Sequence, residues 1–283
     1  MARVAVVTDS NAFLPPQVVE RLNIHVLPHT IYLEQGSFKE GVNLTPGQYF
    51  RLLAQSSDSF LPRASGPGPE AFFDLYSHLY RTTDQILSLH MSGHLSDAVQ
   101  NARTARQMLL GRCQIEVIDT QTATMGLGLL VQAAATAARS GYGLADCVRL
   151  VRGMMPHIYL FFLVRRLAYL ERERRISPAQ ALLGHMLRVM PLLQVEDGEI
   201  IPLEKVRSSQ RGIDKLFDYV SEFAQIEQAI VLQHGFDAET AELTQRFKMA
   251  FPHKKFPVMS INPSLAVHIG PEALGVVVFE RIT

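Results

Sequence analysis

The sequence places Ser92-Gly93 between an apolar run at 86–91 and a segment with helical spacing of alanines from Ala98 onward. The run predicts a β-strand, and the alanine spacing predicts a helix that begins near Ser96. A hydroxyl group and unblocked backbone N–H groups would then lie at the positive end of a helix. That combination favours the binding of an anion.

Four further polar clusters follow apolar runs, and each is a candidate ligand site. They are Thr8-Asp9-Ser10, Ser65-Gly66, the segment around Asp119, and His268 with Gly270. In a parallel α/β sheet, polar residues at the carboxyl ends of strands gather at one edge, where such folds bind ligands. Taken singly, each cluster is also typical of an ordinary turn or helix cap.

Enzymatic interpretations of these residues find little support in the sequence. Ser92 lacks the flanking glycines of a nucleophile elbow. His90 and His94 have the spacing of a metal pair on a helix, but Gly93 lies between them and no third ligand is evident. The sequence contains neither G-x-x-x-x-G-K-[ST] nor G-x-G-x-x-G, the loops that hold nucleotide phosphates.

The elements that must position these residues alternate in the first half of the chain. We expect strands at 4–8, 25–33, 85–90 and 114–119. Helices are expected to begin behind Pro15-Pro16, to cover 45–55 and 69–81, and to follow Ser96 and Met125. This alternation predicts a parallel α/β layer. Pro28 favours an edge position for the second strand.

The second half of the chain has a different pattern. Residues 190–206 predict a β-hairpin that turns at Asp197-Gly198. Further strands are expected at 228–235, 256–262 and 274–281, with helices at 208–223 and 237–250. We therefore expect an α/β protein of two domains, an N-terminal parallel α/β layer at 1–155 and a C-terminal mixed-sheet α+β domain at 156–283.

Composition excludes several classes of protein. At 283 residues, with 47% hydrophobic residues and a mean hydropathy of +0.09, the chain is expected to fold and not to be disordered. Basic and acidic residues number 27 each, so the net charge lacks the basic excess typical of nucleic-acid binders. Only two cysteines occur, and neither a signal peptide nor a membrane span is predicted, so we expect a cytoplasmic protein.

Taken together, the clusters resemble the motifs of the DegV family of bacterial fatty-acid-binding proteins. The opening "VVTDSNAFLP" is close to that family's V-T-D-S-x-x-x-L-P, and "HIGPEALG" is similar to its H-[TV]-G-P-G-A-L-G. The other matching segments are, in order, "ASGPGPEAF", "MSGHLSDA", "VIDTQTATMGLG", "LAYLERERRIS" and "EKVRS". Each motif alone is weak, but seven in the family's order, nearly from end to end, are specific.

The resemblance implies a DegV-like protein that holds one long-chain fatty acid between its two domains, with the acyl chain in an apolar tunnel. It implies no catalytic residue, metal or cofactor, and a separate kinase subunit that converts the bound fatty acid to an acyl phosphate for phospholipid synthesis. It assigns the fatty-acid carboxylate to Ser65, Ser92, Gly93, His268 and Gly270. We also expect a monomer.

A basic segment is a candidate docking surface for that kinase. Residues 165–175 hold five arginines and two glutamates, an excess of three positive charges. We interpret Arg172, Arg174 and Arg175, together with Arg207, as a patch that docks on an acidic surface. A solvated helix face with internal ion pairs explains the same charges equally well.

Three positions depart from the family pattern. Ala64 replaces a threonine that would contact the carboxylate, Glu173-Arg174 replace two glycines before Arg175, and His94 replaces a second threonine. These departures predict that the head group is held differently, or that the ligand is not a plain fatty acid. An alternative of another class is a phosphotransferase-like enzyme, because dihydroxyacetone kinases have a related two-domain architecture and also use a histidine.

Overall fold

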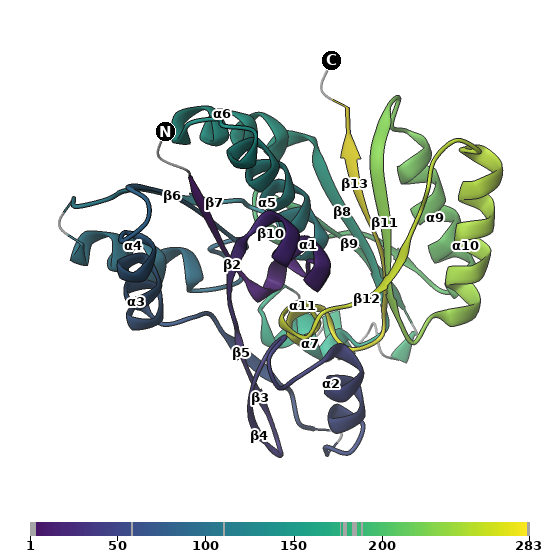
Figure 1. Cartoon of the computed structure of the whole chain (residues 1–283). Coiled ribbons are helices and arrows are strands. Elements are labelled where there is room, and N and C mark those ends of the chain that lie inside the picture. Colours follow the sequence, from purple (N-terminus) through teal and green to yellow (C-terminus); the bar gives the residue numbers. More distant parts are fainter. Residues whose placement is uncertain are drawn as a thin grey trace. The chain divides into compact units, whose positions relative to one another are not determined.

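A computed structural model of the chain describes residues 4–57, 59–109, 111–175, 177, 180–182, 186–187 and 189–281. The chain divides into two compact units, Met1–Pro156 and His157–Thr283. Figure 1 shows their helices and strands. The first unit contains a parallel sheet and the second a mixed sheet, so the predicted fold class is confirmed.

The first unit is built on four parallel strands. Their order is β2 (Ile24–Leu27), β1 (Ala5–Asp9), β6 (Gln85–His90) and β7 (Gln114–Asp119). The chain leaves β1 toward β2 on one side and reaches β6 on the other, so the strand order reverses between β1 and β6. In open α/β sheets, the crevice at such a reversal is where ligands bind.

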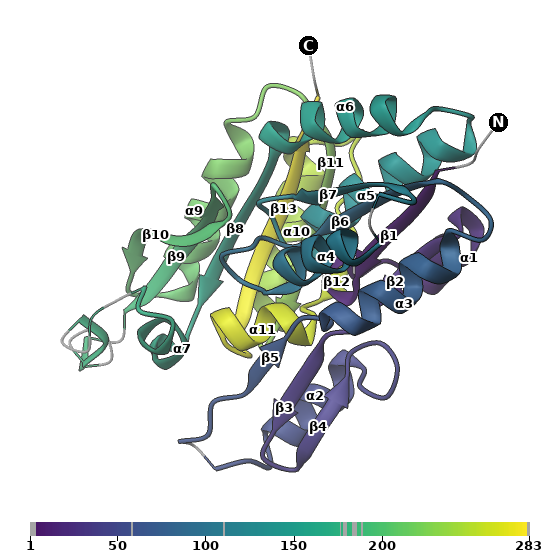
Figure 2. The same ribbon diagram turned by 90° about the vertical axis from the view of Figure 1, so that its left-hand side faces the viewer.

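Helices cover the parallel sheet on both faces (Figure 2). On one face, α3 (Pro69–Leu79) and α4 (Ala98–Met108) bury apolar side chains against β1, β6 and β7. On the other, α5 (Thr124–Arg139) packs against β1 and β6, with α1 (Pro16–Leu22) and α6 (Leu144–Met154) beside it. Gly128 of α5 lies so close to the short helix η1 (Ser10–Ala12) that a Cβ there would overlap the Ala12 carbonyl oxygen.

A small antiparallel sheet follows β2 in the chain. It consists of β4 (Gly36–Lys39), β3 (Thr30–Leu33) and β5 (Arg63–Ser65), and α2 (Pro46–Leu53) connects β4 to β5. The expected strand at 25–33 is therefore wrong as one element. It ends at Pro28, which has no N–H to donate, and resumes as β3 in a different sheet.

The second unit is a six-stranded sheet in which only β11 and β12 are parallel. Its order is β10 (Glu199–Val206), β9 (Met190–Glu196), β8 (Ile158–Val164), β13 (Ala273–Glu280), β11 (Ile226–His234) and β12 (Val258–Ser260). The predicted hairpin is present as β9 and β10. It turns at Asp197-Gly198, whose φ angles of 49° and 83° suit an Asp-Gly turn.

The described helices of the second unit form two pairs, beside one short helix at the start of the unit. The predicted helices α9 (Ser209–Ser221) and α10 (Asp237–Ala250) cover one face of the sheet and form its core with β8, β11 and β13. Two short helices that the sequence did not predict, α7 (Leu167–Arg172) and α11 (Pro263–Ile269), pack against each other. A short helix η2 (Met155–His157) precedes β8.

Candidate functional site

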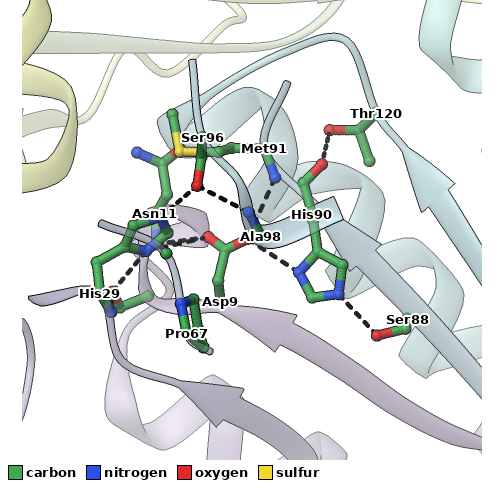
Figure 3. A network of polar contacts seen from close by, with 12 residues as sticks. Asp9, Asn11, His29, Pro67, Ser88, His90, Met91, Ser96, Ala98 and Thr120 are labelled. Carbon is green, nitrogen blue, oxygen red and sulfur yellow. Dashed lines mark hydrogen bonds and ion pairs between the residues drawn. The ribbon is translucent and has the colours of Figure 1, made fainter. Parts of the chain in front are cut away.

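The carboxyl edge of the parallel sheet holds a buried pair of ionisable groups. Asp9 ends β1 and His90 ends the neighbouring β6, so the strand reversal places them side by side. The Oδ2 atom of Asp9 lies 3.0 Å from His90 Nδ1 and accepts the Met91 N–H at 3.3 Å. Figure 3 shows Asp9 between the rings of His29 and His90.

The second carboxylate oxygen of Asp9 is also occupied. It accepts the Asn11 N–H at 3.0 Å and lies 3.7 Å from His29 Nδ1. Burial alone would raise the pKa of Asp9, but the neighbouring rings of His29 and His90 and the Met91 N–H hold it below its ordinary value. Asp9 is therefore a carboxylate whose charge is balanced inside the fold.

The same network contains the atoms of a hydrolytic triad in the order hydroxyl, imidazole, carboxylate. His90 Nε2 lies 2.7 Å from Ser88 Oγ, which also accepts the Tyr76 hydroxyl at 2.7 Å. Ser88, His90 and Asp9 are all 0% exposed. Since no substrate can reach Ser88 in this state, the network is structural, and Ser92, the serine weighed as a nucleophile, is no part of it.

His29 extends this network to the loops around it. Its backbone N–H donates to Ser10 Oγ at 2.9 Å, and the Ser10 hydroxyl donates to the buried carboxylate of Glu40. Its Nε2 atom lies 3.1 Å from Ser96 Oγ, in the segment that precedes α4. His29 and Glu40 were not predicted as site residues, because neither belongs to a sequence motif of recognisable chemistry.

Ser92 and Gly93 lie in the segment that follows β6. Ser92 is buried, its N–H donates to the Thr122 carbonyl at 2.9 Å, and its Oγ accepts the His94 N–H at 3.1 Å. Gly93 is exposed, and its N–H donates to Asp119 Oδ2 at 3.2 Å. The amide expected to hold a ligand's carboxylate therefore holds one of the chain's own carboxylates.

The loop that follows Asp119, the last residue of β7, is conformationally strained. Gln121 has a φ of 52°, which is uncommon for any residue with a side chain, and Thr124 has a φ of 48°, which is rare for a β-branched residue. The Thr124 N–H donates to Asn11 Oδ1 at 2.6 Å, whereas the buried hydroxyls of Thr122 and Thr124 have no hydrogen-bond partner among the described residues. Strain of this kind is concentrated at ligand sites, and it was not visible in the sequence.

Ser65 ends β5, next to the start of α4. Its hydroxyl lies 3.3 Å from the Tyr32 hydroxyl, and the following Gly66 donates its N–H to Asp97 Oδ1 at 2.7 Å. Asp97 directly precedes α4, which begins at Ala98, two residues later than predicted. The chain around Ser65 is thus tied to the same helix start that follows Ser92.

In the second unit, His268 lies in the last turn of α11 beside the end of α7. Its Nδ1 atom is 3.4 Å from Oε2 of Glu173, and Oε1 of Glu173 is 2.8 Å from Nη2 of Arg172. Burial alone would raise the pKa of Glu173, but contact with His268 and Arg172 lowers it to about 2. His268, like Gly93, is next to an internal carboxylate.

Gly270 ends α11 and forms a turn. Its φ of 93° is unfavourable for a residue with a side chain, and its N–H donates to the Ala266 carbonyl at 2.8 Å. A Cβ at this position would lie 3.3 Å from the Tyr169 ring and 3.4 Å from Arg166 Cβ. The turn and the close approach to α7 therefore favour glycine at this position, and the Gly270 amide is already hydrogen-bonded.

Most of the basic segment is paired within the second unit. Arg165 lies 3.0 Å from Glu239, and Arg175 lies 3.1 Å from Glu199. Arg172 contacts Glu173 and also donates to the Val267 carbonyl. Of the four arginines assigned to docking, only Arg174 and Arg207 are exposed.

Two further expectations concern metals and membranes. His94 is exposed and His90 is bound to Asp9, so they do not act as a pair. No group of three or more His, Cys, Asp or Glu residues that could hold a metal ion is found in the described part of the chain. None of the helices in that part is long and apolar enough to cross a membrane.

Known proteins match the chain over its whole length. The family described as "Uncharacterised protein, DegV family" matches residues 3–281. The DegV domain-containing protein SCO2569 of Streptomyces coelicolor is 34% identical over an alignment of 283 positions. The alignment covers 98% of this chain and 99% of that protein.

Solved structures match equally fully. A structure described as "Fatty Acid Binding of a DegV family Protein from Thermus thermophilus" is 28% identical, with a TM-score of 0.84 over 99% of this chain and 100% of that one. The fatty acid binding DegV family protein SAG1342 of Streptococcus agalactiae is 25% identical, with a TM-score of 0.89 over 100% of both chains.

Proposed function

This chain is a member of the DegV family, and we propose that it binds one long-chain fatty acid. The observation that carries the proposal is the end-to-end match with DegV proteins whose structures are described as fatty-acid-binding. We assign the fatty-acid carboxylate to Ser65 and the Ser92-Gly93 segment of the first unit and to His268 of the second, with Gly270 placing that histidine.

Two of these residues already contact carboxylates that belong to the chain. The Gly93 N–H donates to Asp119, and the His268 ring lies beside Glu173. A ligand's carboxylate would therefore have to replace Asp119 to accept the single N–H of Gly93. Each charge-assisted hydrogen bond to a ligand's carboxylate would contribute about 1.5–3 kcal/mol.

The acyl chain would supply most of the affinity. Each buried CH₂ contributes about 0.8 kcal/mol, so a long acyl chain contributes on the order of 10 kcal/mol. Ordering the ligand and fixing its position offset several kcal/mol of this amount. The remainder predicts a complex that survives purification.

We propose further that the bound fatty acid is presented to a separate kinase subunit, which forms an acyl phosphate for phospholipid synthesis. The chain has no phosphate-binding loop with which to hold a nucleotide itself, and the buried Ser88–His90–Asp9 network offers no accessible nucleophile. Exposed Arg174 and Arg207 are the candidate docking residues.

The proposal is tested by what the protein carries when it is purified from bacteria. Mass spectrometry of an organic extract should find about one long-chain fatty acid per chain, and added palmitate or oleate should raise the melting temperature of delipidated protein. An extract without acyl chains, together with no thermal shift, would refute the assigned ligand.

A further inference from the structure

The contact between α7 and α11 gives His268 a polar neighbour that the head-group assignment does not use. Glu173 directly follows α7, and its Oε2 lies 3.4 Å from Nδ1 of His268. The His268 side chain is 11% exposed, and its buried Nδ1 atom has this ion-pair contact but no hydrogen-bond partner among the described residues.

We propose that Glu173 is a positioning residue for His268. Its carboxylate faces Nδ1 of the imidazole ring, so that the N–H at Nε2 is left to donate to the anionic head group of the ligand. This inference rests on the proposed function, because it concerns how the assigned head-group residue is prepared. A carboxylate beside one imidazole nitrogen fixes the orientation of the ring, and a protonated imidazole donates from both of its nitrogens.

Arg172 completes the arrangement. Its guanidinium lies 2.8 Å from Glu173 Oε1 and also donates to the carbonyl of Val267, which precedes His268 in α11. Glu173 is thus held from both sides. With His268 protonated, the charges of Arg172, Glu173 and His268 sum to one positive charge, which suits a single carboxylate.

The other groups near this turn leave that charge in place. Arg166, which lies beside Gly270, is paired with Glu272 at 3.5 Å, and the Tyr169 ring is buried and neutral because burial raises its pKa. The pKa of Glu173 is lowered to about 2 by its partners, against the effect of burial, so its negative charge is constant at physiological pH.

A competing interpretation of the contact between Glu173 and His268 predicts the opposite preference for the ligand's head group. If Glu173 simply occupied His268 and repelled a second carboxylate, the site would prefer a lipid with a neutral head group. Measuring the dissociation constants of oleate and oleyl alcohol for the same variants separates these two roles.

The experiment uses full-length, delipidated protein and displacement of a fluorescent fatty acid. We expect Glu173→Gln to weaken oleate binding about tenfold, because the His268 ring loses the carboxylate that holds its orientation. Oleyl alcohol should bind wild type and variant alike. Glu171→Gln, at a half-exposed position two residues away, is the matched control and should change nothing.

A double-mutant cycle distinguishes positioning from a general structural effect. In a His268→Ala background, Glu173→Gln should cause no further loss of oleate affinity. A loss that persists in that background, or no loss in the single variant, would overturn the inference. Tighter oleate binding by Glu173→Gln would also overturn it, in favour of competition. If wild type binds neither lipid, the proposed function itself has failed.

Discussion

At the scale of single residues, the charge on Asp9 is the feature with the clearest energetic consequence. Its carboxylate is fully buried yet balanced by His90, His29 and two backbone N–H groups. Because its pKa in the folded state is lowered, ionised Asp9 stabilises the fold above about pH 4, the ordinary value for an unfolded aspartate. That contribution is lost as the pH falls through the folded-state value.

We therefore expect Asp9→Asn to lower the free energy of unfolding by about 3–5 kcal/mol at neutral pH, since it leaves His90 without its buried partner. The deficit should shrink as the pH falls below about 4, because wild type then loses the same interaction. Urea unfolding followed by circular dichroism at several pH values measures it. Asp74→Asn, at an exposed position of α3, is the control, and a deficit independent of pH would contradict the argument.

At the scale of elements, α5 is placed by a glycine. Alanine has a higher helix propensity than glycine, so Gly→Ala within a helix ordinarily stabilises a protein by about 0.5–1 kcal/mol. At Gly128, however, the added methyl group would overlap the Ala12 carbonyl oxygen of η1 and lie 3.3 Å from Leu14.

Gly128→Ala should therefore destabilise the protein by about 1–3 kcal/mol, the usual cost of overpacking. Gly153→Ala in α6 is the matched control, because nothing lies within 4 Å of the Cβ it would add, and it should be neutral or stabilising. Chemical denaturation of both variants measures the difference. Equal effects would show that α5 can shift away from η1.

Elements were predictable from sequence where their burial is one-sided or their ends are marked. Strands β1, β6 and β7 are short apolar runs that end at polar residues, and the β9–β10 turn carries Asp-Gly. Strand β8 is a buried apolar run like β1 and β6, but it was missed because only the short helix η2 separates it from α6, so no turn marks its start. The strands of the small sheet have only three or four residues each.

The residues of the candidate site were predictable from the sequence, but their surroundings were not. Ser92 and His268 came from a resemblance of motifs, which gives residue types in order along the chain. Their surroundings, the Asp119 carboxylate at the Gly93 amide and Glu173 at the His268 ring, depend on contacts between segments far apart in sequence. A single sequence contains no signal for such contacts.

At the scale of the whole molecule, the proposed kinase subunit must recognise arginine side chains that are exposed and not engaged in ion pairs within the chain. Arg172 and Arg175 are engaged within the second unit, so reversing their charge would disturb that unit as well as any docking surface. Arg174 and Arg207 are exposed, and an exposed arginine that meets an acidic partner surface mainly affects association.

We expect Arg174→Glu combined with Arg207→Glu to reduce acyl-phosphate formation by a reconstituted kinase at least about tenfold, while bound lipid stays at wild-type level. Arg103→Glu, at an exposed position of α4, is the control for a change of charge. Kinase turnover and lipid content are measured on the same preparations. Unchanged turnover would exclude these arginines from docking, and loss of lipid would indicate damage to the fold.

The buried Ser88–His90–Asp9 network bears on how enzymes are recognised from coordinates. Its distances of 2.7 Å and 3.0 Å satisfy a geometric template for a serine hydrolase. A template search that compares only interatomic distances would therefore return this chain as a hydrolase. The distinguishing quantity is access, because a nucleophile that is 0% exposed and hydrogen-bonded to Tyr76 cannot form a bond to a substrate. Solvent exposure of the nucleophile belongs in the definition of such a template, beside its distances.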